Sequence, residues 1–295
     1  MSATSGLHGS NPQRERRRRA AAIFRLFCAA MTCLGIVLLF ALILRIGREG
    51  LPWLDFHFIA NPPSRFAHKA GILPALAGSA WIVLLTALLS IPLGVGAALY
   101  LEEYAPRNRA TALLEINLAN LAGVPSIIYG ILGLALFVRG LALGESVLSG
   151  ALTMTLLVLP VIVVASREAI RAVPATFRHA AFALGATRWQ TVRHHVLPSA
   201  LPGILTGIIL SLSRSIGESA PLIIVGAVGY VAFLPNTPLD AFSVLPIQIF
   251  NWTSRPQEDF HGLAAAAILV LLATLLLMNS AAVWIRQRAR KERPW

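Results

Sequence analysis

Apolar residues along the chain are gathered into six long segments separated by shorter polar ones. A helix needs roughly 20 apolar residues to cross the hydrocarbon layer of a bilayer, and each segment is that long. None alternates apolar and polar residues with a period of two, so helices rather than a closed barrel are expected. We therefore predict an all-α, polytopic membrane protein with six transmembrane helices at residues 22–45, 72–99, 113–138, 142–165, 200–231 and 262–285.

Two of these segments contain polar residues. The third carries Glu115, Asn117 and Asn120 near its start, so the point at which it enters the membrane is open. The two asparagines can line a pore, or they can form hydrogen bonds between helices. The fifth segment is interrupted by the stretch 214–221, which contains charged residues, a glycine and a proline.

The composition excludes an ordinary soluble domain. The 295 residues are 56% hydrophobic and 13% charged, whereas soluble domains have about 25% charged residues. The net charge of +12 does not indicate a nucleic-acid partner, because such a binder must be a soluble protein with a basic face. Cys28 and Cys33 lie inside the first apolar segment, where neither a disulfide framework nor a zinc cluster is expected.

The chain divides into four parts. Residues 1–20 are polar and arginine-rich, which predicts a disordered basic cytosolic tail. Residues 21–70 hold the first transmembrane helix and an outer loop. Their apolar run at 23–46 exceeds the roughly 7 to 15 residues of a signal peptide, so the helix is expected to be retained. Residues 71–288 hold the other five helices, and residues 289–295 form a second basic tail.

The basic residues fall mainly on one side of the predicted membrane. If the N-terminus is cytosolic, the cytosolic segments contain 18 of the 25 Lys and Arg residues and the outer segments contain six. Arg214 is the one left inside a span. Because basic residues accumulate in cytosolic loops, both termini are predicted to lie in the cytosol.

Sequence motifs for enzymatic chemistry are missing. There is no Gly-x-x-x-x-Gly-Lys-[Ser/Thr] loop, and neither Lys69 nor Lys291 could sit in one, so we expect no ATP site on this chain. The adjacent His194 and His195 point about 100° apart on a helix, and no histidine pair has the spacing of a metal site. We expect a chain without catalytic residues, metal or cofactor of its own.

The longest predicted cytosolic segment, residues 166–198, has the pattern of two short helices. Gly185 is placed to end the first helix, Thr187 can cap the second, and Pro198 is expected to stop it. A compact, protruding pair of helices of this kind is either a docking element for a cytosolic partner or a solvated loop that holds two spans at a fixed distance. The physical pattern alone favours neither.

This loop resembles the Glu-Ala-Ala motif of ABC importer permeases, in which Gly follows after three residues and Ile-x-Leu-Pro after nine more. In that family the loop is the coupling helix, which fits a groove on the ATPase subunit and transmits its closure. The resemblance implies a type I ABC importer permease (MetI-like) fold for residues 71–288. Histidine replaces the family's Glu and Ile, which puts the glutamate contact to the ATPase in question. The matching positions are His179, Ala180, Ala181, Gly185, Leu197 and Pro198, with His195 at the Ile position.

A charged pair lies deep in the fifth segment. Arg214 lies roughly 22 Å along this span at 1.5 Å per residue, where an unpaired charge costs on the order of 3 kcal/mol or more. Glu218 is four residues later and can pair with it. The pair either locks helix packing, or it presents the arginine fork to a tetrahedral oxyanion while Glu218 limits retention of the anion. In the second case Gly217 lets a neighbouring backbone approach, and Pro221 interrupts the helical hydrogen bonds.

The stretch around this pair resembles the Arg-x-x-Gly-Glu-[Thr/Ser]-Ala-Pro-Leu signature of phosphate-specific ABC importer permeases of the PstA type. The signature matches residues 214–222, and two further stretches agree, residues 123–130 and 245–252. The resemblance covers about residues 70–285. It implies a permease subunit that moves inorganic phosphate into the cytoplasm, with Arg214, Glu218 and Gly217 in the substrate pathway.

The resemblance also implies partners for the chain in a bacterial inner membrane. These are membrane lipid, a homologous permease that forms a heterodimer with it, two ATPase subunits that bind ATP and Mg²⁺, a periplasmic phosphate-binding protein, and a link to a phosphate-sensing histidine kinase complex. The alternative substrate is another oxyanion, sulfate or molybdate, because an arginine fork does not choose among tetrahedral anions. A membrane enzyme or lipid-handling scaffold would need a buried catalytic constellation that the sequence does not show.

Overall fold

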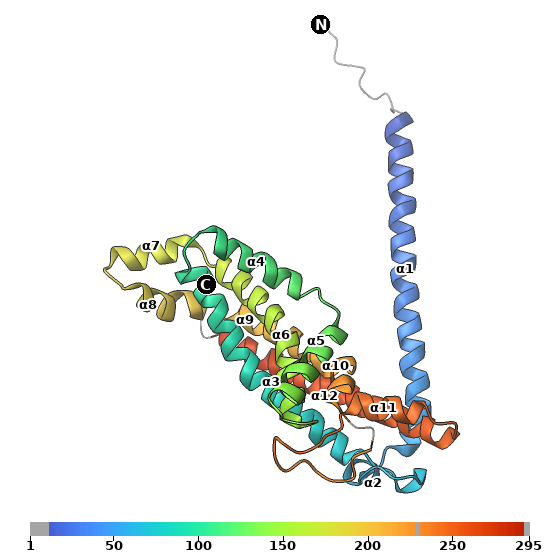
Figure 1. The fold of residues 1–295 in the computed structure, drawn as a ribbon. Helices are drawn as coiled ribbons and strands as arrows, with labels where there is room; N and C mark the ends of the chain where they lie inside the picture. The colour runs from blue at the N-terminus through green and yellow to red at the C-terminus, as the bar shows by residue number, and fades with distance from the viewer. Residues whose placement is uncertain (1–11, 228–229, 292–295) are drawn as a thin grey trace.

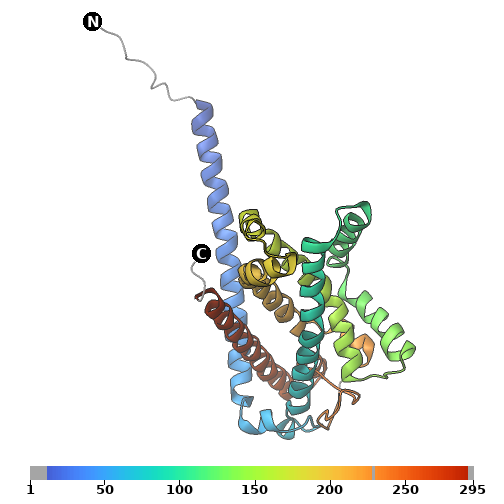
Figure 2. The same ribbon diagram turned by 90° about the vertical axis from the view of Figure 1, so that its left-hand side faces the viewer.

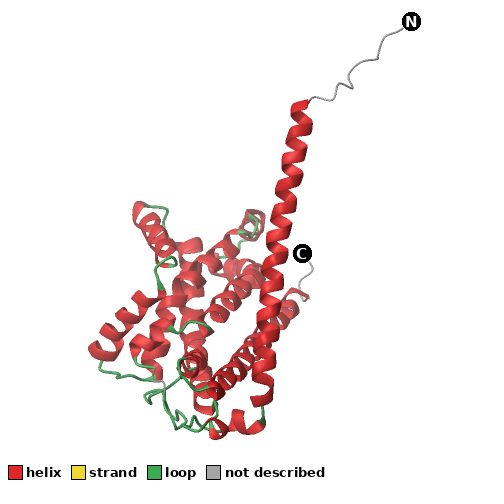
Figure 3. Cartoon of the chain, turned by 90° about the vertical axis from the view of Figure 1, so that its right-hand side faces the viewer, coloured by secondary structure: helices red, strands yellow, loops and turns green. Residues whose placement is uncertain are grey.

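The computed structural model describes residues 12–227 and 230–291, and within these ranges it contains helices and no strand (Figures 1 and 3). The long helices are α1 (Pro12–Gly50), α3 (Leu73–Leu99), α4 (Arg109–Leu121), α6 (Val147–Arg171), α9 (Leu197–Ile216) and α12 (Glu258–Lys291). The shorter helices are α2 (Phe56–Ala60), α5 (Ser126–Gly133), α7 (Ala175–Ala183), α8 (Arg188–Thr191), α10 (Ala220–Val225) and α11 (Leu245–Thr253). Short 3₁₀ turns cover Leu51–Trp53 and Ala67–Lys69, and π-helical turns cover Tyr100–Tyr104, Leu134–Gly140 and Val192–Val196.

The helices account for the predicted spans. Five continuous helices in the described residues are long and apolar enough to cross a membrane: Arg16–Trp53, Leu73–Tyr104, Val147–Arg171, Arg188–Ile216 and Glu258–Arg288. The predicted third span is a bent pair, Arg109–Leu121 and Ser126–Gly140, whose axes differ by 103°. Counting this pair as one broken span gives the six spans that the hydrophobic pattern predicts.

Three boundaries differ from the sequence-based expectation. Residues 12–20 are helical rather than part of a disordered tail, because the arginines, Gln13 and Glu15 there are good helix formers that extend the following apolar helix. Residues 1–11 and 292–295 of the predicted tails lie outside the described residues. At the other end, α12 continues to Lys291. The fifth span ends at Ile216 rather than at residue 231, with consequences for the site described below.

Small residues bring α6 and α9 close together. A Cβ atom on Gly207 would lie 2.5 Å from the Cβ of Ala165, and one on Gly203 would lie 2.8 Å from that of Ala169. In both helices the two residues are four apart and so lie on one face. Such small residues let transmembrane helices approach closely. This contact fixes α9 against the central helix α6 and thereby positions the residues near its C-terminal end.

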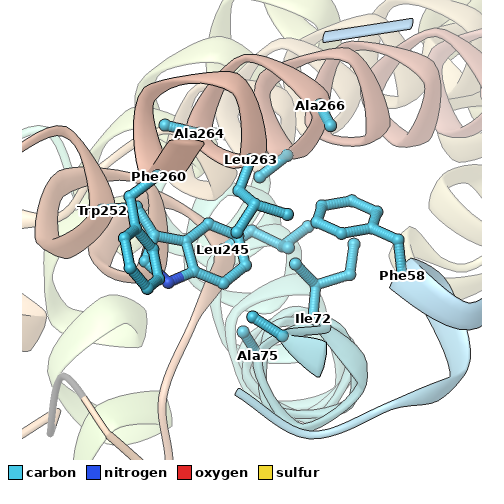
Figure 4. Close-up of a cluster of buried hydrophobic side chains, with 11 residues drawn as sticks. Phe58, Ile72, Ala75, Leu245, Trp252, Phe260, Leu263, Ala264 and Ala266 are labelled. Carbon is cyan, nitrogen blue, oxygen red and sulfur yellow. The ribbon is translucent and has the colours of Figure 1, made fainter. Parts of the chain in front are cut away.

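A buried apolar cluster joins the elements at the end of the bundle opposite α7 and α8. It contains Phe58 of α2 and Trp252 of α11, whose ring centroids are 5.9 Å apart. Figure 4 shows these rings with Ile72 at the start of α3 and Leu263 of α12. Because residues far apart in sequence share this core, the loops at this end form one packed layer.

Helix α1 stands beside the rest of the bundle and projects beyond it (Figures 1 and 2). It packs against α12 near its C-terminal end, where a Cβ on Gly50 would lie 2.7 Å from the backbone of Ala265. The apolar side chains of its middle part are exposed in the single chain. A helix that is apolar all round is suited to lipid or to another membrane protein.

Candidate functional site

The fifth span is broken next to the predicted charged pair. Helix α9 ends at Ile216, Gly217 caps it, and the short helix α10 begins at Ala220. Pro221 lies in the first turn of α10, where its missing N–H group costs no helical hydrogen bond. Irregular backbone at membrane depth is tolerated where protein or a water-filled cavity covers it. The break therefore marks a place where a pathway through the bundle is structurally possible.

Arg214 and Glu218 form a loose ion pair across this break. Nε of Arg214 lies 3.6 Å from Oε1 of Glu218, which confirms the predicted pairing. The Arg214 side chain keeps 75% of its surface exposed, against 23% for Glu218. Since 3.6 Å is too long for a hydrogen bond, most of the donor capacity of the guanidinium stays available.

Gly217 lies between the two charged residues in a right-handed conformation. A Cβ atom added there would meet a single atom within 4 Å, the carbonyl oxygen of Arg214 at 3.7 Å. The described chain therefore brings no second backbone segment up to Gly217. The close backbone approach that the sequence suggested stays a prediction, and it would have to come from another chain or a ligand.

A pocket opens in front of Arg214 and is bounded by the bend between α4 and α5, by α6, and by the end of α9. Its empty volume is about 440 Å³, including the part open to solvent. The lining polar residues from α5 and α9 are Ser126, Tyr129, Ser211, Arg214 and Ser215, and Glu218 completes the set beyond the end of α9. Ser126 and Tyr129 lie in the stretch 123–130 and Ser215 in the stretch 214–222 noted in the sequence, but no spacing marks them as pocket residues, because isolated hydroxyl groups in apolar helices carry no periodic signal.

Two stretches noted in the sequence meet beside this pocket. A Cβ on Gly130 of α5 would lie 2.8 Å from Cα of Pro221 in α10, so only glycine permits this approach. The hydroxyl of Tyr129 donates a hydrogen bond to the carbonyl oxygen of Leu121 at 2.7 Å and thereby ties α5 to the end of α4. The bend of the third span and the break of the fifth span are thus packed against one another.

The predicted loop at residues 166–198 has the expected pair of helices joined at Gly185. Gly185 has a φ of +82°, and its N–H bonds to the carbonyl of Phe182 while the N–H of Ala186 bonds to that of Ala181. These two bonds form a Schellman motif, which ends α7. Thr187 and Gln190 form a capping box that begins α8. Local sequence signals therefore determine this part of the structure.

The prediction that Pro198 ends the second helix is wrong. A continuous helix runs from Arg188 to Ile216, and Leu197 and Pro198 lie inside it. The π-helical turn Val192–Val196 precedes them, and the N–H of Leu197 bonds to the carbonyl of Val192, five residues back. Proline is tolerated here because the shifted hydrogen bonds place it in the first turn of the following α-helical stretch.

The tip of the loop is apolar and exposed. His179 and Ala180 lie on the exposed side of α7, while Ala181 is buried. Beyond them Leu184 is 89% exposed, and Phe182 and Trp189 are also exposed. Large apolar side chains on a protruding loop are typical of a protein interaction site.

Ion pairs join the base of this loop to the π-helical turn after α3 and to α4. Nη2 of Arg178 lies 2.6 Å from Oε1 of Glu103, and the same guanidinium donates to the carbonyls of Val173 and Ile170. Nearby, Arg167 contacts Glu115 at 2.7 Å and Glu102 at 3.4 Å. Figures 1 and 2 show α7, α8 and the start of α4 at the same end of the bundle. No local spacing in the sequence indicates these pairings, because the partners lie 52 to 75 positions apart.

Fold and site together define a polytopic helical membrane protein with a broken span beside a polar pocket and with a structured loop at one end. Over residues 90–291 the chain matches the family of binding-protein-dependent transport system inner membrane components, and it belongs to that family. It is therefore a multi-pass inner-membrane protein and the permease component of an ABC importer, distinct from the ATPase subunit.

Curated relatives support this membership. The probable ABC transporter permease YqgI of Bacillus subtilis is 35% identical over 270 residues, which cover 88% of this chain and 91% of YqgI. The phosphate transport system permease PstA 1 of Mycobacterium tuberculosis is 34% identical over 235 residues, which cover 78% of this chain and 75% of that protein. PstA of Pasteurella multocida is 30% identical over 82% of this chain and 86% of its own.

Solved structures show the same fold at lower identity. A chain of a bacterial transporter that imports the acidic polysaccharide alginate aligns with a TM-score of 0.66 at 16% identity, over 94% of this chain and 99% of that one. A chain of the inward-facing MetNI methionine transporter aligns with a TM-score of 0.57 at 19% identity, over 74% of this chain and 94% of that one. The predicted importer-permease fold is thereby confirmed.

Proposed function

We propose that this chain is the permease subunit of an ABC importer for inorganic phosphate, a PstA-type protein. The observation that carries the proposal is the exposed Arg214 fork in a pocket at the break of the fifth span. An arginine with free donors is suited to bind a tetrahedral oxyanion. The phosphate permeases among the relatives support phosphate in particular.

Arg214 serves as the anion contact in this proposal, and Glu218 orients it and keeps binding weak enough for release. Gly217 and Pro221 keep the backbone irregular beside the pathway. The anion moves inward by alternating access as the pocket opens to one side of the membrane and then to the other. ATP and Mg²⁺ act on a separate ATPase subunit, and this chain carries no cofactor.

The loop at residues 166–198 is the proposed contact with the ATPase. His179 and Ala180 lie on its exposed side together with the apolar tip, while Ala181, Gly185, Leu197 and Pro198 build its frame. Both termini are cytosolic in this orientation, and so is the loop. The complete transporter contains a homologous permease, two ATPase subunits and a periplasmic phosphate-binding protein, with a link to a phosphate-sensing histidine kinase complex.

The experiment is ATP-dependent uptake of labelled phosphate into proteoliposomes that hold the complete transporter. Arg214→Gln should reduce uptake at least about tenfold, because the corresponding 1.4 kcal/mol is a modest value for a hydrogen-bonded charge contact. Arg139→Gln, which changes an exposed arginine outside the pocket, is the matched control and should retain uptake. Normal uptake by a well-expressed Arg214→Gln transporter would refute the role of this arginine.

The second candidate function is import of sulfate or molybdate by the same machinery, since the arginine fork binds any tetrahedral oxyanion. Competition between these anions and labelled phosphate in the same uptake assay separates the two. If sulfate enters and phosphate does not, the phosphate assignment is wrong and the permease class stands.

A further inference from the structure

Three hydroxyl groups of the Arg214 pocket direct their protons away from it. Ser211 donates to the carbonyl of Gly207 at 2.8 Å, and Ser215 donates to that of Leu212 at 2.8 Å. Tyr129 donates to the carbonyl of Leu121 at 2.7 Å. A hydroxyl group has one proton and two lone pairs. With the protons engaged by the backbone, these oxygens can only accept hydrogen bonds from a ligand in the pocket.

Glu218 adds a stronger acceptor to the same pocket. Among the described residues its carboxylate contacts Arg214 alone, at 3.6 Å, so both oxygens keep lone pairs for another donor. Arg214 supplies donors and can accept nothing. The Ser126 hydroxyl, which also lines the pocket, forms no hydrogen bond within the described part of the chain and can turn either way. The pocket therefore combines one cationic donor fork with several acceptors.

This mixture fits a protonated anion. Inorganic phosphate carries at least one proton at neutral pH, and so does arsenate, whereas sulfate and molybdate carry none. A P–OH group can donate to Glu218 while the unprotonated oxygens accept from Arg214. An unprotonated anion would instead set its lone pairs against those of Glu218, and sites built to hydrogen-bond a ligand hydroxyl reject analogues that lack it.

We propose that the Arg214 pocket distinguishes phosphate from sulfate by detecting the proton of the anion through Glu218 and the hydroxyl oxygens of Ser211 and Ser215. This inference rests on the proposed phosphate function. It adds that the permease itself, at the Arg214 pocket, selects phosphate over sulfate. The selection is independent of any made by a binding protein. It also settles, within the proposal, which of the two candidate oxyanion classes the pathway favours.

The test measures binding of labelled phosphate to the transporter complex in nanodiscs without a binding protein, in competition with arsenate, sulfate and molybdate. Arsenate should compete at concentrations within about threefold of phosphate. Sulfate and molybdate should compete only at concentrations at least about tenfold higher, a modest ratio for an anion that lacks the hydrogen-bond donor. Equal competition by sulfate and phosphate in the unaltered complex would overturn the inference and would leave the proposed function intact.

Substitutions locate the effect. The amide of Glu218→Gln can donate to an unprotonated oxygen. In this variant the concentrations of sulfate and of unlabelled phosphate that displace half of the labelled phosphate should differ by no more than about threefold, since the substitution removes the unpaired acceptor. Glu218→Asp should preserve the discrimination. Glu258→Gln, the same change at an exposed site outside the pocket, should have no effect. An unchanged ratio in Glu218→Gln contradicts the inference.

Two results separate this inference from the proposed function. If the unaltered complex binds no phosphate, the proposed substrate site fails first. If Glu218→Gln binds no anion at all, the double variant Ser211→Ala and Ser215→Ala tests the selection by acceptor oxygens instead. It should lose part of the discrimination against sulfate while it still binds phosphate, and full discrimination in this variant would count against acceptor-based selection.

Discussion

The arginines in two regions of this bundle, the base of the loop and the pocket at the broken span, are in opposite states. At the base of the loop, Arg178 and Arg167 are largely buried, and each contacts at least two groups. In the pocket, Arg214 is three-quarters exposed and forms one loose ion pair within the part of the chain that the structure describes. Arginines of the first kind are held by carboxylates and carbonyls of the chain itself, although Nε of Arg167 is buried without a hydrogen-bond partner in the described residues. The second kind has donors to spare, which is what a ligand requires.

The difference in burial between these arginines predicts different effects on the free energy of unfolding when they are replaced. A buried charge whose partner is removed leaves an uncompensated charge, which is strongly destabilising, whereas an exposed pair contributes little. The loop arginines should therefore matter for stability and for the position of the loop. Arg214 should matter for transport and hardly for folding.

The largest effect is expected at Arg167. Arg167→Met leaves Glu102 without one partner and Glu115 unpaired in a partly buried place. The variant should lose about 3 to 5 kcal/mol, seen as a lower midpoint of thermal unfolding in detergent. Arg193→Met, at an exposed position of the loop, is the control. Equal midpoints for the two variants would show that the Arg167 cluster does not hold the helices together.

The next effect is expected for the pair Arg178 and Glu103. Replacing either residue by glutamine should cost about 1.5 to 3 kcal/mol, the usual contribution of hydrogen bonds to charged groups. The double variant should cost less than the sum of the two single variants, because the pair is one interaction. Both single variants should also hydrolyse more ATP per phosphate transported. Additive destabilisation would mean that the two side chains act independently.

A smaller effect is expected at Gly185. No atom lies within 4 Å of an added Cβ, so Gly185→Leu meets backbone strain alone, about 1 to 2 kcal/mol. The strained joint should misplace α7 and uncouple ATP hydrolysis from uptake in proteoliposomes. Gly185→Asn is the matched control, since asparagine tolerates a left-handed conformation. Full coupling in the leucine variant would argue against docking by this loop.

The smallest effect on stability is expected at Arg214. Arg214→Gln removes a single exposed contact and should change stability by about 1 kcal/mol or less. The same variant should lose phosphate uptake, as proposed above. Thermal unfolding measured beside uptake checks the contrast. A large fall in the unfolding midpoint would place Arg214 with the structural arginines and remove the distinction between the two regions.

The loop shows how far local signals reach. The left-handed Gly185 and the Thr187 cap act within a few residues, so the sequence predicts them correctly. Pro198 carried an equally clear local signal, to stop a helix, yet the helix continues. In the π-helical turn before it, Val192 and Val196 are both buried, and Val196 belongs to a core cluster with Ile170 and Ala200. A packing preference of this kind cannot be read from the proline alone.

The site shows the same division. The i, i+4 spacing of Arg214 and Glu218 indicated a pair, and the pair forms. The spacing did not indicate that α9 ends between them. Nor did it indicate that Tyr129 and Ser126 from another span would face the same pocket.

The sequence by itself determined the number and approximate position of the spans, the two-helix form of the loop and the pairing within the fifth span. All of these depend on hydrophobic runs or on residues a few positions apart. Tertiary structure decided which arginines are occupied by the chain and which remain available. Glu102 and Glu103 reach Arg167 and Arg178 across 65 and 75 positions of sequence. Such contacts form only where tertiary packing brings separate helices together, so no local pattern encodes them.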